Sequence, residues 1–384
     1  MIRQLNFLVA LAAVAGVAGI LAVMSRPQAR EGVVFKDKAI EVYGSGYTLS
    51  RLAALASEAG HPELFAYDPR KREATANASI IIRGSLAIGD PADPSLGETL
   101  LLNTIVCGDL QVQVARGGEL RIHNSVLQTV SQVITADKCS RGYYFFADGT
   151  LEAADSRILY MSGARGKTVT PHSRADLQRV AFALADDVAF HAYHADGARL
   201  AVRDSQFLCE GRYGVWVEGS GGEPLRLERC RLSGSEADLY LSGNRPAAEL
   251  IDCQFNRAKI RFHQNSGTVA VRWTATVKAV ERGTGRPVPG LDIVAASEAP
   301  PAETVRGRTG PDGACTLILT EYIATPNSPD GSGADNSYTP HRITALSPEG
   351  KPLAELRGHQ ARGPAALLTL ETEPASLPAR GSEP

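Results

Sequence analysis

The sequence has little of several features that point to particular functions. Its 384 residues include 40 Lys and Arg against 42 Asp and Glu, so it lacks the excess positive charge that favours nucleic acid or another polyanion. Aromatic residues make up only 6% of the chain, and the six cysteines show no spacing typical of metal ligands. We therefore expect no nucleic-acid partner, no metal site and no cofactor.

Long apolar runs are also scarce, and the longest stands at the N-terminus. Residues 7–24 form an uninterrupted apolar stretch of 18 residues between Arg3 and Arg26. As a helix this stretch would reach about 27 Å, which just spans a hydrocarbon core. We expect residues 1–32 to be a membrane anchor, with a cleaved signal peptide as the alternative. The rest of the chain would then be an extracytoplasmic domain held at a membrane, or a secreted or periplasmic protein.

Glycine (37) and proline (22) are abundant, and short apolar segments recur between them, which is typical of an all-β protein with many turns. Six segments each begin with an apolar residue and end seven positions later with another: residues 120–127, 151–158, 177–184, 200–207, 225–232 and 248–255. Two positions before each end stands a small or apolar residue: Ser125, Ser156, Phe182, Ser205, Cys230 and Cys253. The segments follow one another at intervals of roughly 20 to 30 residues, and a repeat of this length indicates a solenoid.

The phase of the apolar residues predicts a corner inside each segment. Val202 and Ser205 have opposite parity, so a straight strand cannot place both on one face. A corner at Arg203 and Asp204 resolves the conflict, and Asn or Asp at the equivalent positions suits a turn. A second apolar strand follows in most repeats, as in residues 213–217. Stacked turns of this kind would form a coiled parallel sheet, whereas a β-sandwich would show hairpin turns and no constant period.

The repeats in residues 79–267 resemble those of the right-handed parallel β-helix superfamily, the pectate-lyase-like coil, with its inward ladders of Ser, Cys or aliphatic residues. The resemblance covers about half of the chain and implies an all-β fold with a right-handed parallel β-helix of about eight rungs. Its open N-terminal end requires a cover. Residues 48–60 predict a capping helix within residues 33–78, with Thr48 as N-cap and Leu49, Leu52 and Leu55 on its buried side.

The period stops at residue 268. Alternating apolar residues then predict a half-buried strand over residues 269–279, and residues 283–295, 309–319 and 365–371 suggest further strands. The phrases RPVPGLDI and TGPDGACTL resemble the carboxypeptidase-regulatory-like or Ig-like β-sandwiches of exported proteins. This resemblance implies that residues 268–373 form an accessory β-sandwich, and we expect a disordered tail over 374–384.

The β-helix resemblance also implies a possible carbohydrate chemistry, because many members are lyases, hydrolases or epimerases that use clustered carboxylates. The nearest candidates are Asp186 and Asp187, followed by His191 and His194. The paired acids resemble those of polygalacturonases, but the companion Gly-His-Gly and Arg-Ile-Lys motifs are absent. The alternative is a solvated corner of the coil.

A binding surface is the competing hypothesis. Val215 and Val217 are expected to face inward, which turns Trp216 outward, and Tyr240 and Arg261 occupy equivalent positions in the next two turns. Such a row could stack against sugar rings or contact a protein, unless loops or the C-terminal domain cover it. Because the sequence shows no complete set of catalytic acid and base residues, we expect an exported cell-envelope protein without catalytic activity. It would bind carbohydrate or another envelope component, or act as a scaffold for it. The alternative is a carbohydrate-active enzyme of the pectate-lyase-like type.

The remaining motifs predict structure rather than chemistry. Cys230 and Cys253 are expected to stack inside the coil, while Cys107 and Cys139 are candidates for a disulfide. Residues 327–336 carry carboxylates and glycines loosely like a calcium loop, but without its regular spacing, which favours a flexible turn.

Overall fold

The computed structural model describes residues 32–372 except residues 91, 92, 94, 105–109, 131–141, 163–167, 195–198, 220–222, 264–265, 328–332 and 364–365. The described residues form five sheets and a single α-helix, and most strands in the first part of the chain pair in parallel. The all-β prediction is therefore confirmed, and the long parallel sheets are compatible with a β-helix. Both the candidate span over residues 7–24 and the expected tail lie outside the described residues.

The first part of the chain contributes strands to four of the five sheets; we call two of them sheets I and II, and we group the other two as sheet III. Sheet I contains β3 (Tyr47–Thr48), β7 (Ser85–Ile88), β10 (Glu119–His123), β13 (Thr150–Ala154), β15 (Arg174–Gln178), β18 (Arg199–Arg203), β21 (Leu225–Glu228), β24 (Ala247–Ile251) and the start of β26 (Thr268–Glu281). Sheet II contains β4 (Phe65–Asp68), β5 (Glu73–Ala76), β8 (Thr99–Leu102), β11 (Val126–Thr129), β14 (Arg157–Leu159), β16 (Ala181–Ala185), β19 (Gln206–Cys209) and β22 (Arg231–Ser233).

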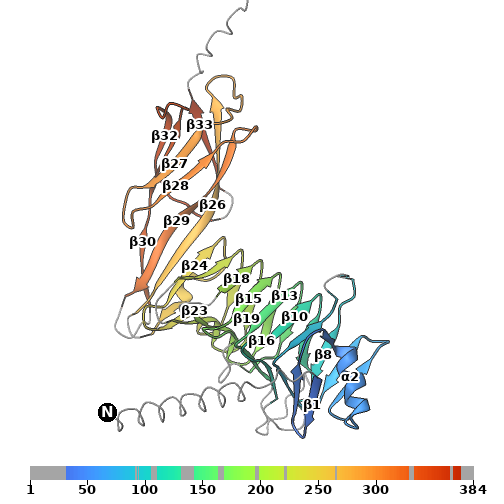
Figure 1. Ribbon diagram of the computed structural model, residues 1–384. Coiled ribbons are helices and arrows are strands. Elements are labelled where there is room, and N and C mark those ends of the chain that lie inside the picture. Colours follow the sequence, from blue (N-terminus) through green and yellow to red (C-terminus); the bar gives the residue numbers. More distant parts are fainter. Residues whose placement is uncertain are drawn as a thin grey trace, which may run out of the picture.

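Sheet III has two parts. The first comprises β1 (Gly32–Lys36), β2 (Ala39–Tyr43), β6 (Ser79–Ile82), β9 (Gln111–Val114) and β12 (Tyr144–Ala147), and the second comprises β17 (Val188–His194), β20 (Tyr213–Gly219), β23 (Ala237–Gly243) and β25 (Ile260–Phe262). Val169 forms parallel bridges to both Ala147 and Ala192 and so connects the two parts. Successive strands along the chain visit different sheets and then return, which stacks each turn of the coil on the one before (Figure 1).

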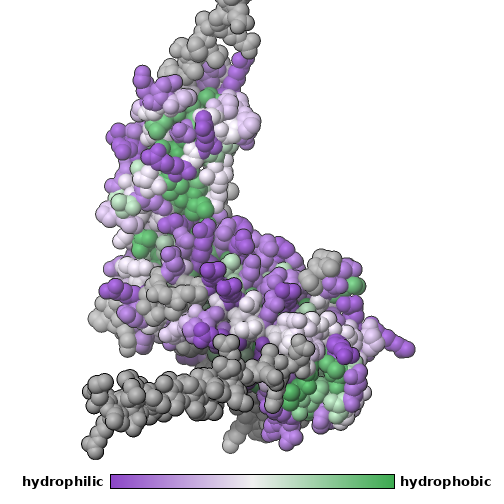
Figure 2. All heavy atoms as spheres, in the orientation of Figure 1, coloured by the Kyte–Doolittle hydropathy of each residue, from purple (hydrophilic) through white to green (hydrophobic). Residues whose placement is uncertain are grey.

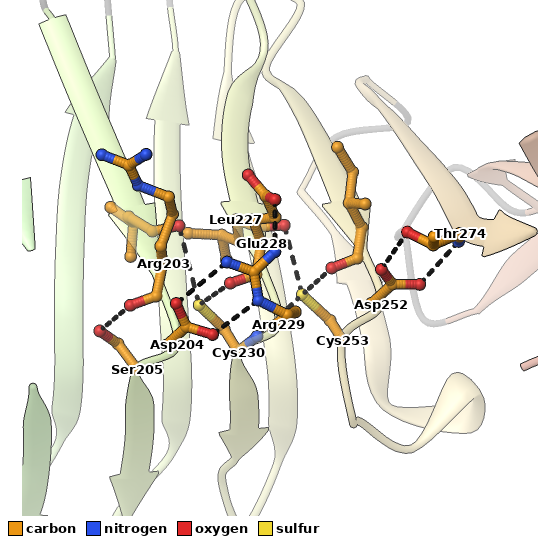
Figure 3. A network of polar contacts seen from close by, with 12 residues as sticks. Arg203, Asp204, Ser205, Leu227, Glu228, Arg229, Cys230, Asp252, Cys253 and Thr274 are labelled. Atoms are coloured by element: carbon orange, nitrogen blue, oxygen red, sulfur yellow. Dashed lines mark hydrogen bonds and ion pairs between the residues drawn. The ribbon is translucent and has the colours of Figure 1, made fainter. Parts of the chain in front are cut away.

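The predicted corner between the strands of sheets I and II is present, and its backbone is left-handed. Asp204 has φ of 54°, and the equivalent residues of neighbouring turns have φ between 51° and 54°. Apart from Asn or Asp, a non-glycine residue rarely adopts this conformation. These positions carry alternating charges along the stack: Asp155, Arg179, Asp204, Arg229 and Asp252. Asp204 accepts hydrogen bonds from Nε and Nη2 of Arg229 at 2.6 and 3.0 Å (Figure 3).

A ladder of hydroxyls and thiols lies directly inside this corner. The Oγ of Ser205 donates to the Arg203 carbonyl at 2.7 Å and accepts from the backbone N–H of Val180, in the previous turn, at 3.1 Å. Cys230 and Cys253 occupy the same column in the next two turns, as expected, and the Sγ of Cys253 accepts from the Cys230 N–H at 3.4 Å. The ladder therefore supplies partners to backbone groups that would otherwise be buried and unpaired.

The predicted alignment of residues 177–184 with the other repeats is wrong by two positions. Strand register pairs Leu177 with Val202, and Phe182, rather than residue 184, with Phe207. The Phe182 and Phe207 rings stack at 5.5 Å in the core, and Val180 takes the column of Ser205. A shift of two positions leaves the facing of every side chain unchanged, and residues 182 and 184 are both apolar, so either could be taken as the end of the segment.

The two ends of the coil are covered differently. Helix α2 (Leu49–Glu58) lies at the N-terminal end, and the Thr48 side chain caps it by accepting from the Arg51 N–H at 3.3 Å (Figure 1). The helix buries Leu49, Leu52 and Ala56, whereas Leu55, predicted to be on this side, is half-buried. At the other end, the short η1 helix (Arg257–Lys259) precedes β25.

The C-terminal part consists of two further sets of strands. β26 pairs with β29 (Ala314–Pro326) and β33 (Ala366–Thr372), and β29 pairs with β30 (Ala334–Tyr338). A separate antiparallel sheet contains β28 (Thr304–Arg308), β27 (Asp292–Ser297), β31 (His341–Leu346) and β32 (Pro352–His359). β26 buries every second residue from Val269 to Ala279, as predicted. Its first residues still pair in parallel with β24, and the strand then rises away from the coil (Figure 1).

Over the described ranges, no helix has the length and apolar character needed to cross a membrane.

Candidate functional site

The predicted outward row of side chains lies on the second part of sheet III. Val215 and Val217 of β20 are fully buried, so the alternation of the strand turns Trp216 to the outside. Parallel register then aligns the outward residues of four neighbouring strands, which we call the aromatic strip: His191, Trp216, Tyr240 and Arg261. Trp216, Tyr240 and Arg261 are half-buried, while His191 is only 6% exposed.

The rings of the strip stack on one another. The His191 and Trp216 rings are 4.1 Å apart and nearly parallel, and Tyr213 stacks on Tyr240 in the same way at 4.4 Å. Trp216 and Tyr240 meet edge to face at 5.6 Å, and the Trp216 Nε1 donates to the Ser242 hydroxyl at 2.7 Å. One face of each stacked ring is therefore covered by its neighbour, and a ligand would meet ring edges and the remaining faces.

Charged groups border the strip. The Nε2 of His191 lies 3.2 Å from the carboxylate of Glu218, and the guanidinium of Arg212 lies 4.9 Å from the centre of the Tyr213 ring. Burial raises the pKa of both Tyr213 and Tyr240, so both phenols are protonated at neutral pH and can donate hydrogen bonds. The strip thus combines apolar ring surface with hydroxyl, carboxylate and guanidinium groups.

The candidate catalytic residues lie beside the strip. Asp187 accepts from Nε and Nη2 of Arg212 at 2.5 and 3.1 Å, and this hydrogen bonding raises the pKa of the guanidinium. Asp186 is exposed and accepts from the Ser162 hydroxyl at 3.0 Å. His191 approaches Glu218 as described above, and the side chain of His194 lies outside the described residues. The structure therefore places Asp187 in a bidentate ion pair rather than in an open acid and base pair.

Reasoning from the sequence missed Arg212, Tyr213 and Glu218. Strict alternation places Tyr213 on the inner face with Val215, two positions away. The observed pairing joins Val188 to Tyr213 and then Phe190 to Val215, with Gly214 also buried, so the strand is irregular here and Tyr213 turns outward. Only the glycine in the middle of the strand could have signalled this irregularity.

The metal and disulfide predictions are only partly covered by the described residues. Within those ranges, no group of three or more His, Cys, Asp or Glu side chains is arranged to hold a metal ion. Part of residues 327–336, the loop compared with a calcium site, lies outside them, as do Cys107 and Cys139. The four cysteines that are described, Cys209, Cys230, Cys253 and Cys315, are buried and free.

Comparison with known proteins adds no further assignment: no protein-family model, no curated protein and no solved structure matches this chain.

Proposed function

We propose that the protein is an exported, non-catalytic binding or scaffolding protein of the cell envelope, whose aromatic strip holds a carbohydrate. In this proposal the coil is a right-handed parallel β-helix of about eight rungs, of the pectate-lyase-like type, and residues 268–373 form a carboxypeptidase-regulatory-like or Ig-like β-sandwich. Residues 7–24 anchor the chain in a membrane, or direct its export, and leave the coil outside the cytoplasm.

The observation that carries the proposal is the register of the strip. Outward residues on neighbouring parallel strands repeat at about 4.8 Å, which makes a straight and rigid row. Half-buried aromatic rings on such a row offer apolar contact at little cost in side-chain entropy, because stacking already fixes His191 against Trp216 and Tyr213 against Tyr240. A flat, extended ligand matches this surface.

Carbohydrate is the ligand class that suits both parts of the strip. The C–H groups of a sugar can pack on the free parts of the Trp216 and Tyr240 rings, and its hydroxyls can bond to Glu218, Arg261 and the phenols. Hydrolysis or elimination would instead require a free acid and base at the same place. The pairing of Asp187 with Arg212 supports binding without cleavage.

Glycan-array screening of the full-length chain in mild detergent, followed by calorimetry on the best ligand, tests the proposal. Trp216→Ala and Tyr240→Ala should each weaken binding about tenfold or more, as expected for aromatic residues central to a binding surface. Arg261→Gln removes a rim group without opening a cavity and should weaken binding less.

Tyr338→Ala is the matched control, because Tyr338 is an exposed tyrosine (42%) on β30 in the C-terminal part. It should leave the affinity unchanged. Equal affinities for all variants would contradict the binding role of the strip, and shortening of the bound glycan during incubation would contradict the non-catalytic role.

A further inference from the structure

Two arginines on the outer face of sheet I occupy directly opposing positions. Arg174 begins β15 and Arg199 begins β18, and parallel register pairs the two residues. Both are exposed, and neighbouring strands are about 4.8 Å apart, so the two side chains leave the sheet next to each other. Like charges placed directly opposite one another on adjacent strands destabilise a sheet.

The rest of this face is organised as ion pairs. Arg121 lies 2.8 Å from Glu119 and 3.6 Å from Glu152, and Arg203 lies 3.7 Å from Asp176. Further along, Arg272 lies 2.9 Å from Glu249. By contrast, neither Arg174 nor Arg199 has an ion pair or a side-chain hydrogen bond within the part of the chain that the structure describes.

The arginine pair borders a hollow of about 640 Å³ on this face, over β13, β15 and β18. Pro224, at its edge, also lines a second hollow of about 580 Å³, which continues over Ala247 and Ala270 to Pro300 and Pro301. The two hollows meet at Pro224, and we call the pair of them the trough; its second hollow leads toward the C-terminal strands. Figure 2 shows a largely hydrophilic surface over the stacked strands next to the C-terminal part.

We propose that Arg174 and Arg199 together bind a divalent oxyanion, a phosphate or sulfate group, either free or carried by a ligand that lies in the trough. Two guanidinium groups side by side present more donors than one oxygen can use, and a tetrahedral oxyanion offers an oxygen to each. A dianion neutralises both charges, whereas a single carboxylate neutralises one. This site lies on a different sheet from the aromatic strip and does not depend on the proposed function.

The carboxylates around the hollow set a limit on its affinity. Glu152 and Asp176 also line it, but each lies near an arginine of its own, as described above. Glu223, at the rim, has no cation partner within the described ranges and would repel an anion. Glu223→Gln should therefore strengthen oxyanion binding, which distinguishes a site with defined electrostatics from general attraction to the surface.

Calorimetric titration of the full-length chain in detergent with inorganic phosphate, at low ionic strength, tests the proposal. Saturable binding is expected, with a loss of about tenfold or more in Arg174→Gln and in Arg199→Gln, because each variant removes one partner of the anion. Arg231→Gln is the control, since Arg231 is an exposed, outward arginine on sheet II whose neighbours in register are Gln206 and Gln254 rather than a second arginine. Both test variants change exposed side chains, and in phosphate-free buffer they should melt no lower than the wild type.

A parallel titration with phosphatidylcholine vesicles containing phosphatidic acid separates the sources of the oxyanion. Saturation with inorganic phosphate assigns the site to a small or soluble ligand, and binding of vesicles alone, lost in both variants, assigns it to an esterified phosphate. No saturable binding of either probe, or an equal loss in Arg231→Gln, would overturn the proposal. Trp216→Ala should bind phosphate normally, so a failure of the aromatic strip and a failure of this site give different results.

Discussion

The charged corner of the coil provides the sharpest test of how this sequence fixes its turns. Asp204 serves two purposes there: it adopts a left-handed backbone, and it accepts two hydrogen bonds from Arg229. Asp204→Ala removes both contributions, whereas Asp204→Asn removes only the charge, because Asn tolerates the left-handed region as well as Asp does. Comparing the two variants separates the backbone contribution from the electrostatic one.

The expected magnitudes follow from the geometry. A bidentate pair at the surface contributes up to about 1 kcal/mol, and alanine in the left-handed region costs about 1–2 kcal/mol. Asp204→Ala should therefore lower the free energy of unfolding by about 2 kcal/mol, and Asp204→Asn by about 1 kcal/mol or less. Asp176→Ala is the control: it removes an Asp near an arginine from a regular strand and should cost less than about 0.5 kcal/mol.

Urea denaturation at pH 7, followed by circular dichroism, measures these differences. The hydrogen bond from Arg229 lowers the pKa of Asp204 below its ordinary value. A carboxylate with a lowered folded pKa stabilises the protein above its unfolded pKa of about 3.9 and loses this effect as the pH falls through the folded value. The gap between wild type and Asp204→Asn should therefore close on acidification below about pH 4. Equal destabilisation by Ala and Asn at pH 7 would refute the role assigned to the backbone.

Three further predictions concern the same coil. Ser205→Ala leaves the buried Val180 N–H without its acceptor and should cost about 1–3 kcal/mol in urea denaturation, whereas Ser205→Cys, which copies the next two turns, should cost less. Gly89 and Gly117 both have φ near 80°, but they differ in the space around them. A Cβ on Gly89 would lie 2.1 Å from a carbonyl oxygen, whereas a Cβ on Gly117 would contact no neighbouring atom. Gly89→Ala should therefore lower the melting temperature clearly more than Gly117→Ala. Burial raises the pKa of Cys209 to about 11, so its thiol should be unreactive in the folded protein. Mass spectrometry should find Cys209 unlabelled by a disulfide reagent at pH 8 until urea is added. Equal labelling with and without urea would contradict its burial.

The parts of the fold that depend on local alternation could be predicted from the sequence. The corner at Asp204 follows from the change of parity between Val202 and Ser205, and the strand over residues 268–281 follows from its regular apolar positions. The outward position of Trp216 follows from the same rule. Each of these requires only that neighbouring residues alternate between the two faces of a strand.

The parts that depend on register between turns could not be predicted in this way. In residues 177–184 both possible ends of the segment, 182 and 184, are apolar, and in the structure it is Phe182 that packs on Phe207 in the core. The rejected register, which aligned Leu177 with residue 200, would have placed Arg174 away from Arg199. The arginine pair is therefore a consequence of core packing and is not visible as a sequence motif.

The attachment of the C-terminal strands to the coil bears on the trough beside the proposed oxyanion site. β26 continues from its pairing with β24 into the C-terminal part, and Arg257 of η1 donates to the carboxylate of Glu321 in β29 at 2.8 Å. The same carboxylate accepts from the Trp273 Nε1 at 2.6 Å and is fully buried, so loss of either donor would leave a poorly compensated charge. The two parts are thus joined by a continuous strand and by an ion pair whose carboxylate is buried. The second hollow of the trough is lined by both joined parts, from Ala247 to Pro300 and Pro301, so a ligand there would meet a preformed surface and would not have to order a hinge.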